Sequence, residues 1–410
     1  MILEELKPYP LRYKVVVLLF VIDLFAWLLA GFSMYYIKYS REAMDIVCLL
    51  SLLTLGSGMT SVKNVKLSLQ YLGVCLVIMF IPILIYGDTP FVQVITKLCF
   101  AVGFIALKPN FKMAIYKVFL KTFTVIVALG IAEYILLFFN INFTWAVVER
   151  ADPYQVLNQG IFILIPTYSI EGFARFMSLC EEPGGLGTIC FFLLTTLNYK
   201  ENKKTYLILL VAGLISFSLG FYVLITMWTV ANSRKLGFSQ ILLGVLAVAF
   251  LMTYFSGFVE ERIVERVAGR SFAEIDNRTD DETTKKLIEI SGDERLYVGM
   301  GNRNYYNWQT SAGGTSAGVK NFIFQYGIVG LVFLVVGFSI VIFRIRGFNK
   351  ASILIVLFFW ICFYKSNLWN VPQILVALLG YVPALNAIAT NKNHKYVKTV
   401  QPLKYENSIS

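Results

Sequence analysis

Long apolar stretches separated by short basic segments dominate this sequence and limit the folds that it can adopt. A helix needs about 20 apolar residues, and at least about 17, to cross the hydrocarbon layer of a membrane. Because 57% of the residues are apolar and 15% are charged, we expect an all-α polytopic membrane protein rather than a soluble domain. About twelve transmembrane helices are expected, some of them tilted, broken or re-entrant. They are predicted at residues 15–36, 44–61, 67–86, 90–107, 122–140, 184–198, 205–218, 220–232, 236–255, 319–343, 351–364 and 368–388.

The stretch 205–232 fits either one long helix or two short helices that meet near Ser218. Lysines at 200, 203 and 204 precede the stretch, and Arg234 and Lys235 follow it. Cytoplasmic loops are enriched in Lys and Arg, so two such clusters on one side require an even number of crossings. We therefore expect two half-length helices or a re-entrant hairpin.

The distribution of basic residues also predicts the orientation of the chain. The first 14 residues are basic, and no small-residue cleavage site follows the first apolar run, which predicts a retained signal anchor. With the N-terminus inside, the inner loops contain 21 of the 36 Lys and Arg residues. Both termini are then cytoplasmic. The net charge of +11 is spread over short loops rather than gathered in one patch, which argues against nucleic acid as a partner.

The chain is expected to divide into membrane helices and two outward-facing loops. Residues 1–255 hold helices one to nine, with a smaller outer loop at 141–183 that lies at the membrane interface. Residues 256–318 form a large outer loop with 8 Lys or Arg against 11 Asp or Glu. Residues 319–390 hold the last three helices, and 391–410 are a cytoplasmic tail.

The ionisable residues Asp23, Lys97 and Glu133 fall inside expected helices. Such residues are costly in lipid and are candidates for a functional role. Lys97 and Glu133 lie on consecutive helices at similar expected depths, so we predict that they pair.

The large outer loop contains candidate groups for binding anions and sugars. Arg262, Arg266 and Arg270 share one face of a helix, where like charges cost about 0.2 to 0.5 kcal/mol per pair. An anion bound against the three arginines would explain why like charges are placed in one row. The alternative is a solvated helix in which Arg262 pairs with Glu265. The segment from Gly299 to Trp308 adds amides, Arg303, Tyr305 and Trp308, and amides and aromatic faces suit the hydroxyls and C–H faces of sugar rings.

A motif in the smaller outer loop combines an arginine, a Glu-Pro step and several glycines. It reads Arg175-Phe-Met-Ser-Leu-Cys-Glu181-Glu182-Pro183-Gly184-Gly185-Leu186-Gly187. Its Arg-x6-Glu-Pro-x-x-Leu-Gly pattern resembles the bacterial lipid-linked polysaccharide polymerases of the Wzy type, which are related to the O-antigen ligases. A second segment is similar to the end of the large outer loop in those families: Gly299-x-Gly301, then Phe322-Ile-Phe-Gln325-Tyr-Gly327-Ile-Val-Gly330-Leu331.

Two departures from the family patterns bear on the choice between polymerase and ligase. The ligases carry a histidine about eleven residues before the Gly-Ile-x-Gly, where this chain has Ser316, and the Arg-x15-Gly pattern of some polymerases is missing. The missing histidine favours a polymerase.

The resemblance implies a membrane glycosyltransferase of the GT-C kind in the bacterial inner membrane, with 256–318 as a large periplasmic loop. Its donor would be a glycan chain on undecaprenyl diphosphate, and its acceptor a new lipid-linked repeat unit of O-antigen, capsule or exopolysaccharide. A chain-length regulator and a flippase of the same pathway would be further partners.

Transfer from a diphosphate requires fixed cations and one base. Arg175, Arg270, Arg303 and Lys320 are the candidate cations, and Tyr305 and Trp308 are the candidate sugar-binding residues. The only histidine, His394, lies in the tail, so the base is expected to be a carboxylate, first Glu182. A structural ion pair between Glu182 and Arg175 is the alternative. The outer loops contain no Asp-x-Asp, so a metal-independent reaction without a cofactor is expected.

Two other functions remain open at this stage. An O-antigen ligase uses the same donor. A lipid-linked oligosaccharide flippase or other transporter also fits twelve spans, but transporters place their site near the midplane and usually have repeated halves, and this sequence has no visible repeat.

Overall fold

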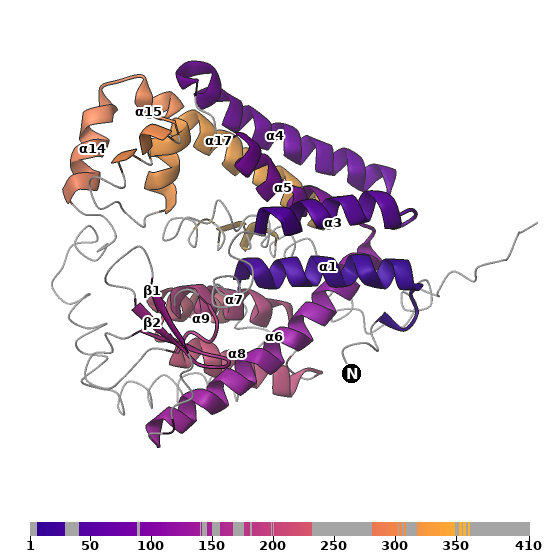
Figure 1. Ribbon diagram of the computed structural model, residues 1–410. Coiled ribbons are helices and arrows are strands. Elements are labelled where there is room, and N and C mark those ends of the chain that lie inside the picture. Colours follow the sequence, from indigo (N-terminus) through magenta and orange to yellow (C-terminus); the bar gives the residue numbers. More distant parts are fainter. Residues whose placement is uncertain are drawn as a thin grey trace, which may run out of the picture.

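The computed structural model describes residues 6–28, 41–87, 91–139, 141, 146–149, 156–166, 176–180, 183–197, 199, 201–231, 281–301, 303–305, 307–308, 318–348, 352–354, 356–357 and 360. These residues form mainly helices, arranged as a bundle (Figure 1). The helices are α1 (Leu11–Leu28), α3 (Arg41–Leu55), α4 (Val62–Tyr86), α5 (Phe91–Ala106), α6 (Pro109–Phe138), α7 (Pro183–Thr196), α8 (Lys203–Ile215), α9 (Leu219–Ala231), α14 (Asp281–Ser291), α15 (Arg295–Val298) and α17 (Gly318–Arg346). The strands are β1 (Ala146–Glu149), β2 (Val156–Gln159) and β3 (Leu164–Pro166).

Three described helices are long and apolar enough to cross a membrane, namely Val62–Tyr86, Pro109–Leu137 and Val319–Arg344. Helices occupy nine of the twelve expected spans. The expected span at 236–255, and most of 351–388, lie outside the described residues. The described part of the chain is therefore largely helical, and its long apolar helices are those of a membrane protein.

The stretch 205–232 contains two helices, as the flanking charges predict. Helices α8 and α9 are 13 residues each and are separated by a turn at 216–218. The hydroxyl of Tyr222 in α9 donates to the carbonyl of Leu214 in α8 at 2.6 Å, which fixes the turn. At 1.5 Å per residue each helix is about 20 Å long, which is shorter than a hydrocarbon layer of about 30 Å.

Helix α6 begins earlier than expected, at Pro109 rather than near residue 122. Proline suits the first helical position because its φ is fixed and its missing N–H would have no partner there. Lys112, expected in an inner loop, is buried near the start of this helix. Its ammonium donates to the carbonyl of Ile105 at 2.9 Å. This lysine therefore satisfies a carbonyl at the C-terminal end of α5.

The N-terminal segment and two interhelical turns meet at one end of the bundle. The turn between α5 and α6 is bonded to the turn between α3 and α4, because the N–H of Lys108 in the first donates to the carbonyl of Met59 in the second at 2.8 Å. The hydroxyl of Tyr13, near the start of α1, donates to the carbonyl of Ser57 at 2.6 Å. All three segments were expected on one side of the membrane, and they lie together here.

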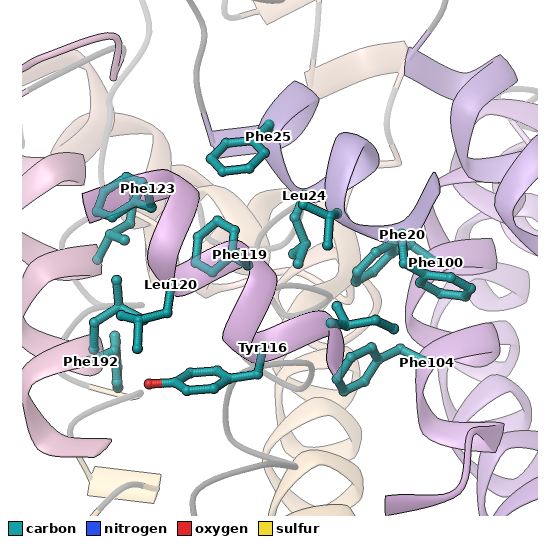
Figure 2. Close-up of a cluster of buried hydrophobic side chains, with 14 of the residues drawn as sticks. Phe20, Leu24, Phe25, Phe100, Phe104, Tyr116, Phe119, Leu120, Phe123 and Phe192 are labelled. Carbon is teal, nitrogen blue, oxygen red and sulfur yellow. The ribbon is translucent and has the colours of Figure 1, made fainter. Parts of the chain in front are cut away.

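Phenylalanine rings fill the space between α1, α5, α6 and α7 (Figure 2). Phe20 of α1 packs on Phe100 of α5 with ring centroids 5.3 Å apart. Phe25 of α1 packs on Phe119 of α6 at 5.1 Å. Because lipid is as apolar as these side chains, close van der Waals packing rather than escape from water holds membrane helices together.

The loop at 141–183 contains a small antiparallel sheet of order β1-β2-β3. Leu157 in the central strand pairs with Val148 on one side and Pro166 on the other. The all-helical prediction is therefore wrong for this outer loop. Strands of three or four residues leave too short a pattern to be read from sequence, and their pairing satisfies backbone groups outside the helices.

Helix α17 is broken at Gly327, which has φ 68° and ψ −179°. The carbonyls of Phe324 and Gln325, just before the break, accept the N–H groups of Met300 at 2.7 Å and Gly301 at 3.3 Å. The part after the break, residues 328–346, is 19 residues long. At about 28 Å it is long enough to cross the membrane by itself.

Glycine is required on both sides of this contact, which we name the glycine clasp (residues 299–301 against 324–327). A Cβ at Gly299 would lie 2.4 Å from the carbonyl oxygen of Gln325, and a Cβ at Gly327 would lie 2.1 Å from that of Tyr297. Both glycines have positive φ. The hydroxyl of Tyr86 donates to the carbonyl of Gly299 at 2.7 Å, which joins the clasp to the end of α4.

We expect Gly299→Ala and Gly327→Ala each to lower the free energy of unfolding by about 1 to 3 kcal/mol, because each adds a backbone clash and an unfavourable φ. Gly73→Ala is the matched control, since a Cβ at this helical glycine meets nothing within 4 Å. Denaturation of the purified protein in mixed detergent micelles measures the effect. Equal losses in all three variants would contradict the role of the clasp.

Candidate functional site

Helices α7 and α9 begin side by side. A Cβ at Gly187, near the start of α7, would lie 3.0 Å from the Cβ atoms of Ser218 and Phe221. Ser218 directly precedes α9, and its hydroxyl accepts the N–H of Phe221 at 3.4 Å. The first N–H groups of a helix have no partner within it, and its N-terminus carries roughly half a positive charge. Two such ends at one place favour the binding of an anion.

Two strained turns lie beside these helix ends. Ser178, with φ 49°, and Phe217, with φ 47°, are the non-glycine residues with positive φ in the part of the chain that the structure describes. The two turns contact each other, because the N–H of Phe176 donates to the carbonyl of Ile215 at 3.3 Å. Such conformations cost on the order of 1 to 3 kcal/mol and cluster at functional sites.

Glu133 of α6 anchors the turn between β2 and β3. Its side chain is only 6% exposed. Its two carboxylate oxygens accept the N–H groups of Ile161 at 2.8 Å and Phe162 at 2.7 Å. The hydroxyl of Ser178 then donates to the carbonyl of Phe162 at 3.1 Å. A continuous series of hydrogen bonds therefore joins the outer part of α6 to the strained turn.

The predicted ion pair between Lys97 and Glu133 lies partly outside the described residues. Both oxygens of Glu133 bind backbone N–H groups, and the side chain of Lys97 lies outside the described residues. The sequence placed the start of α6 too late, because the helix begins at Pro109 rather than near residue 122. Counted from the helix ends away from the turn that joins α5 to α6, Lys97 lies about 9 Å and Glu133 about 8 Å along its helix, and the pair stays a prediction.

The motif residues Arg175 and Glu182 lie outside the described residues, as does Arg270. The structure describes the chain between the first two, from Phe176 to Cys180, and the chain after them from Pro183. Arg175 is thus next in sequence to the strained turn, and Glu182 directly precedes α7. Their predicted roles stay predictions.

Helices α14 and α15, with the segment that follows them, are called the outer helices below. The predicted sugar-binding aromatics belong to a small apolar cluster that these outer helices form with the start of α17. Tyr305 is 4% exposed and lies with Ile290, Met300 and Phe324. Trp308 is half-buried, with its ring centroid 6.0 Å from that of Tyr305 and 5.1 Å from that of Phe324. Burial raises the pKa of the Tyr305 phenol well above its usual value. Tyr305 therefore contributes packing, and Trp308 is the more accessible of the two rings.

The candidate cations of this region differ in exposure. Arg303 is exposed, and Lys320 is half-buried in the first turn of α17. Lys320 precedes the break at Gly327, so it lies outside the part of α17 that is long enough to span the membrane.

The sheet and the outer helices lie at the same end of the bundle, at the left of Figure 1. Tyr86 at the end of α4 contacts the glycine clasp, and Glu133 near the end of α6 holds the β2–β3 turn. The N-terminal segment and its two turns lie at the opposite end. The described parts of both loops that were predicted to face outward therefore lie at one end of the bundle.

Among the described residues no three His, Cys, Asp or Glu side chains lie close enough together to hold a metal ion. The nearest approaches to Asp-x-Asp, Glu274-Ile-Asp276 and Asp280-Asp281-Glu282, have no described side chains, so the metal-independent reaction stays a prediction. No protein-family model matches the chain, and no curated protein matches it.

Sequence reasoning did not find the roles of Ser178 and Phe217, because positive φ values in non-glycine residues have no sequence signal. It identified Glu133 as an ionisable residue within a helix but did not find its bonds to the N–H groups of Ile161 and Phe162. Gly160, which stands between two short β-prone runs, was the available signal for a turn there.

Proposed function

We propose that this protein is a bacterial inner-membrane glycosyltransferase that polymerises lipid-linked oligosaccharide repeat units on the periplasmic face. It transfers a glycan chain from undecaprenyl diphosphate to a new lipid-linked repeat unit. The resemblance of the Arg175–Gly187 motif to Wzy-type polymerases supports the reaction class. The convergence of the starts of α7 and α9 directly after Glu182 is the structural observation that carries the proposal.

A diphosphate leaving group explains why two helix starts and an arginine belong together. As the bond between the anomeric carbon and the diphosphate oxygen breaks, negative charge develops on that oxygen. N–H groups at the starts of α7 and α9 stabilise this charge without moving. Arg175 adds a two-pronged contact to phosphate oxygens.

The acceptor hydroxyl supplies the new bond. Its oxygen attacks the anomeric carbon while its proton passes to a base, for which we assign Glu182. Glu182 adjoins the helix starts in the sequence, so one short segment supplies both the base and the anion-binding groups. The strained turn at Ser178, held by Glu133 through Phe162, fixes the spacing between Arg175 and Glu182.

The outer helices supply the second part of the site in this proposal. Arg303 and Lys320, with Arg270 of the same loop, hold the diphosphate of the second lipid-linked substrate. Trp308 offers a ring face to a sugar. The clasp keeps this unit fixed to α4 and α17, at the same end of the bundle as α7.

We further propose twelve spans with both termini in the cytoplasm. Gly292→Cys, at an exposed position with open space around it, is expected to react with a membrane-impermeant thiol reagent in intact spheroplasts. Lys7→Cys is expected to react only after the membrane is opened, with the wild-type protein as the background. The reverse pattern would contradict the orientation.

Deletion of the gene followed by gel analysis of surface polysaccharide tests the function itself. Loss of a polymerase leaves single repeat units on the surface. Loss of an O-antigen ligase leaves none on the final acceptor, and loss of a flippase accumulates lipid-linked units inside the cell. Either of the last two results would overturn the proposal.

A further inference from the structure

Two carboxyl groups are buried together between helices α1 and α3. Asp23 of α1 and Asp45 of α3 are both 0% exposed. They lie about 18 Å and about 15 Å along their helices from Leu11 and Leu55. Those helix ends lie at the same end of the bundle, so the two carboxyls lie at a similar depth.

The surroundings of Asp23 leave its carboxyl unsatisfied. Asp45 and Cys48 of α3 face it, and Cys99 of α5 lies close to both carboxyls. Neither carboxylate oxygen of Asp23 has a hydrogen-bond partner. Helix α5 also carries Lys97, whose side chain lies outside the described residues.

The buried position of Asp23 calls for a bound cation. Its carboxyl group is 0% exposed, and its two oxygens lack a hydrogen-bond partner. A buried carboxylate without a partner is unstable in its charged form, and the cost is several kcal/mol in a lipid-surrounded interior. Asp45, which faces Asp23, has no proton to donate when both groups are charged, so the pair requires a proton or a metal cation.

We propose that Asp23 and Asp45 form a membrane-embedded proton-binding site in which the two carboxyls share one exchangeable proton. The shared proton bonds the two oxygens and so holds α1 against α3. When the singly protonated pair gives this proton to water, two carboxylates remain, and the repulsion between their charges pushes the helices apart. This site does not depend on the transferase proposal and gives the helix bundle a response to pH.

The expected pH dependence has a definite sign. An unfolded aspartate has lost its proton above about pH 4, whereas the folded pair still holds one, so folding is accompanied by proton uptake. Stability is therefore greatest at acidic pH and falls as pH rises. For one proton, the ratio of folded to unfolded protein falls about tenfold for each unit of rise in pH. This decrease stops at the pH where the folded pair releases its proton.

The test is equilibrium unfolding of the purified full chain in mixed detergent micelles, from mildly acidic to alkaline pH. We expect the wild type to show the one-proton slope. Asp23→Asn, which keeps the shape of a protonated acid, is expected to remove that slope and to be the more stable protein at alkaline pH. Asp293→Asn, on the outer helices, is the matched control and should keep the wild-type slope.

Infrared spectroscopy provides a readout that a merely structural role would not change. A protonated carboxyl band that shifts on exchange into heavy water is expected in the wild type and should be absent in Asp23→Asn. If Asp23→Asn does not fold, Asp45→Asn replaces it in both measurements.

A wild-type slope that persists in a folded Asn variant, or the absence of the infrared band, would overturn the proposal. Stabilisation at alkaline pH by sodium chloride but not by potassium chloride would also overturn it and would assign the pair to a metal cation instead.

Discussion

Glu182→Gln is expected to slow chain elongation by about 10² to 10⁴ while leaving the binding of lipid-linked substrate nearly unchanged. Glutamine keeps the size and hydrogen-bonding capacity of the side chain but cannot take the acceptor proton. A base acts only when the proton moves, so its loss affects the reaction and not the bound state. The measurement uses purified protein with lipid-linked repeat units and scores bound substrate and product length separately.

Glu181→Gln is the matched control, because it removes the same charge one residue away and should retain most of the elongation rate. Arg175→Ala is expected to abolish long chains by weakening both binding and reaction. Arg175→Lys should recover little, since a point charge does not replace a two-pronged contact to phosphate. Near wild-type elongation by Glu182→Gln would show that Glu182 is not the base, and the search would move to Glu274 and Asp276.

Glu133→Ala is expected to destabilise the protein by about 2 to 6 kcal/mol, because it leaves the N–H groups of Ile161 and Phe162 without an acceptor. A buried donor without a partner costs about 1 to 3 kcal/mol, and this substitution creates two. Since total stabilities are about 5 to 15 kcal/mol, little folded protein should be recovered. Thermal unfolding in detergent and the yield of monodisperse protein measure the loss.

Glu133→Gln distinguishes the role of Glu133 in holding the β2–β3 turn from its contribution to the stability of the whole protein. Glutamine keeps one carbonyl acceptor, so we expect about half of the loss in stability. The folded fraction should bind substrate but elongate slowly, because the turn at Ser178 that spaces Arg175 from Glu182 has shifted. Glu294→Gln, at an exposed position on the outer helices, should match the wild type. Unchanged stability of Glu133→Ala would contradict the anchoring role.

Membrane helices could be predicted from sequence because the signal is local. The length of an apolar run is compared with the thickness of the hydrocarbon layer, and no distant residue enters that comparison. The break between α8 and α9 could also be predicted, since the charge clusters on both sides required an even number of crossings.

The boundaries of α6 and the sheet could not be predicted in this way. Lysines in the first turns of α6 indicated a loop, but Lys112 is buried and bonded to Ile105 of the preceding helix. The β1-β2-β3 sheet consists of strands that stabilise each other across gaps in the chain, so no single strand carries a strong pattern.

The pairing of polar groups was decided by the tertiary structure alone. Sequence identified Asp23 and Glu133 as costly residues in helices, but the partners of both lie on other elements. Asp45 faces Asp23 from α3, and the turn at Ile161 reaches Glu133 from the sheet. Which polar groups meet depends on the relative depth and rotation of helices, and these are set by side-chain packing over the whole bundle.

The glycine motifs also show the difference between what the sequence predicts and what the tertiary structure decides. Sequence marked Gly299, Gly301 and Gly327 as special, because glycine tolerates backbone conformations that other residues avoid. Only the folded chain brings Gly299 and Gly301 against the carbonyls that precede Gly327, and Gly299 and Gly327 each leave room for the backbone opposite. The sequence by itself thus determined which segments are apolar enough to form membrane helices, whereas the tertiary structure decided where several of them begin or break and which polar groups meet, because contacts between distant residues leave no local pattern.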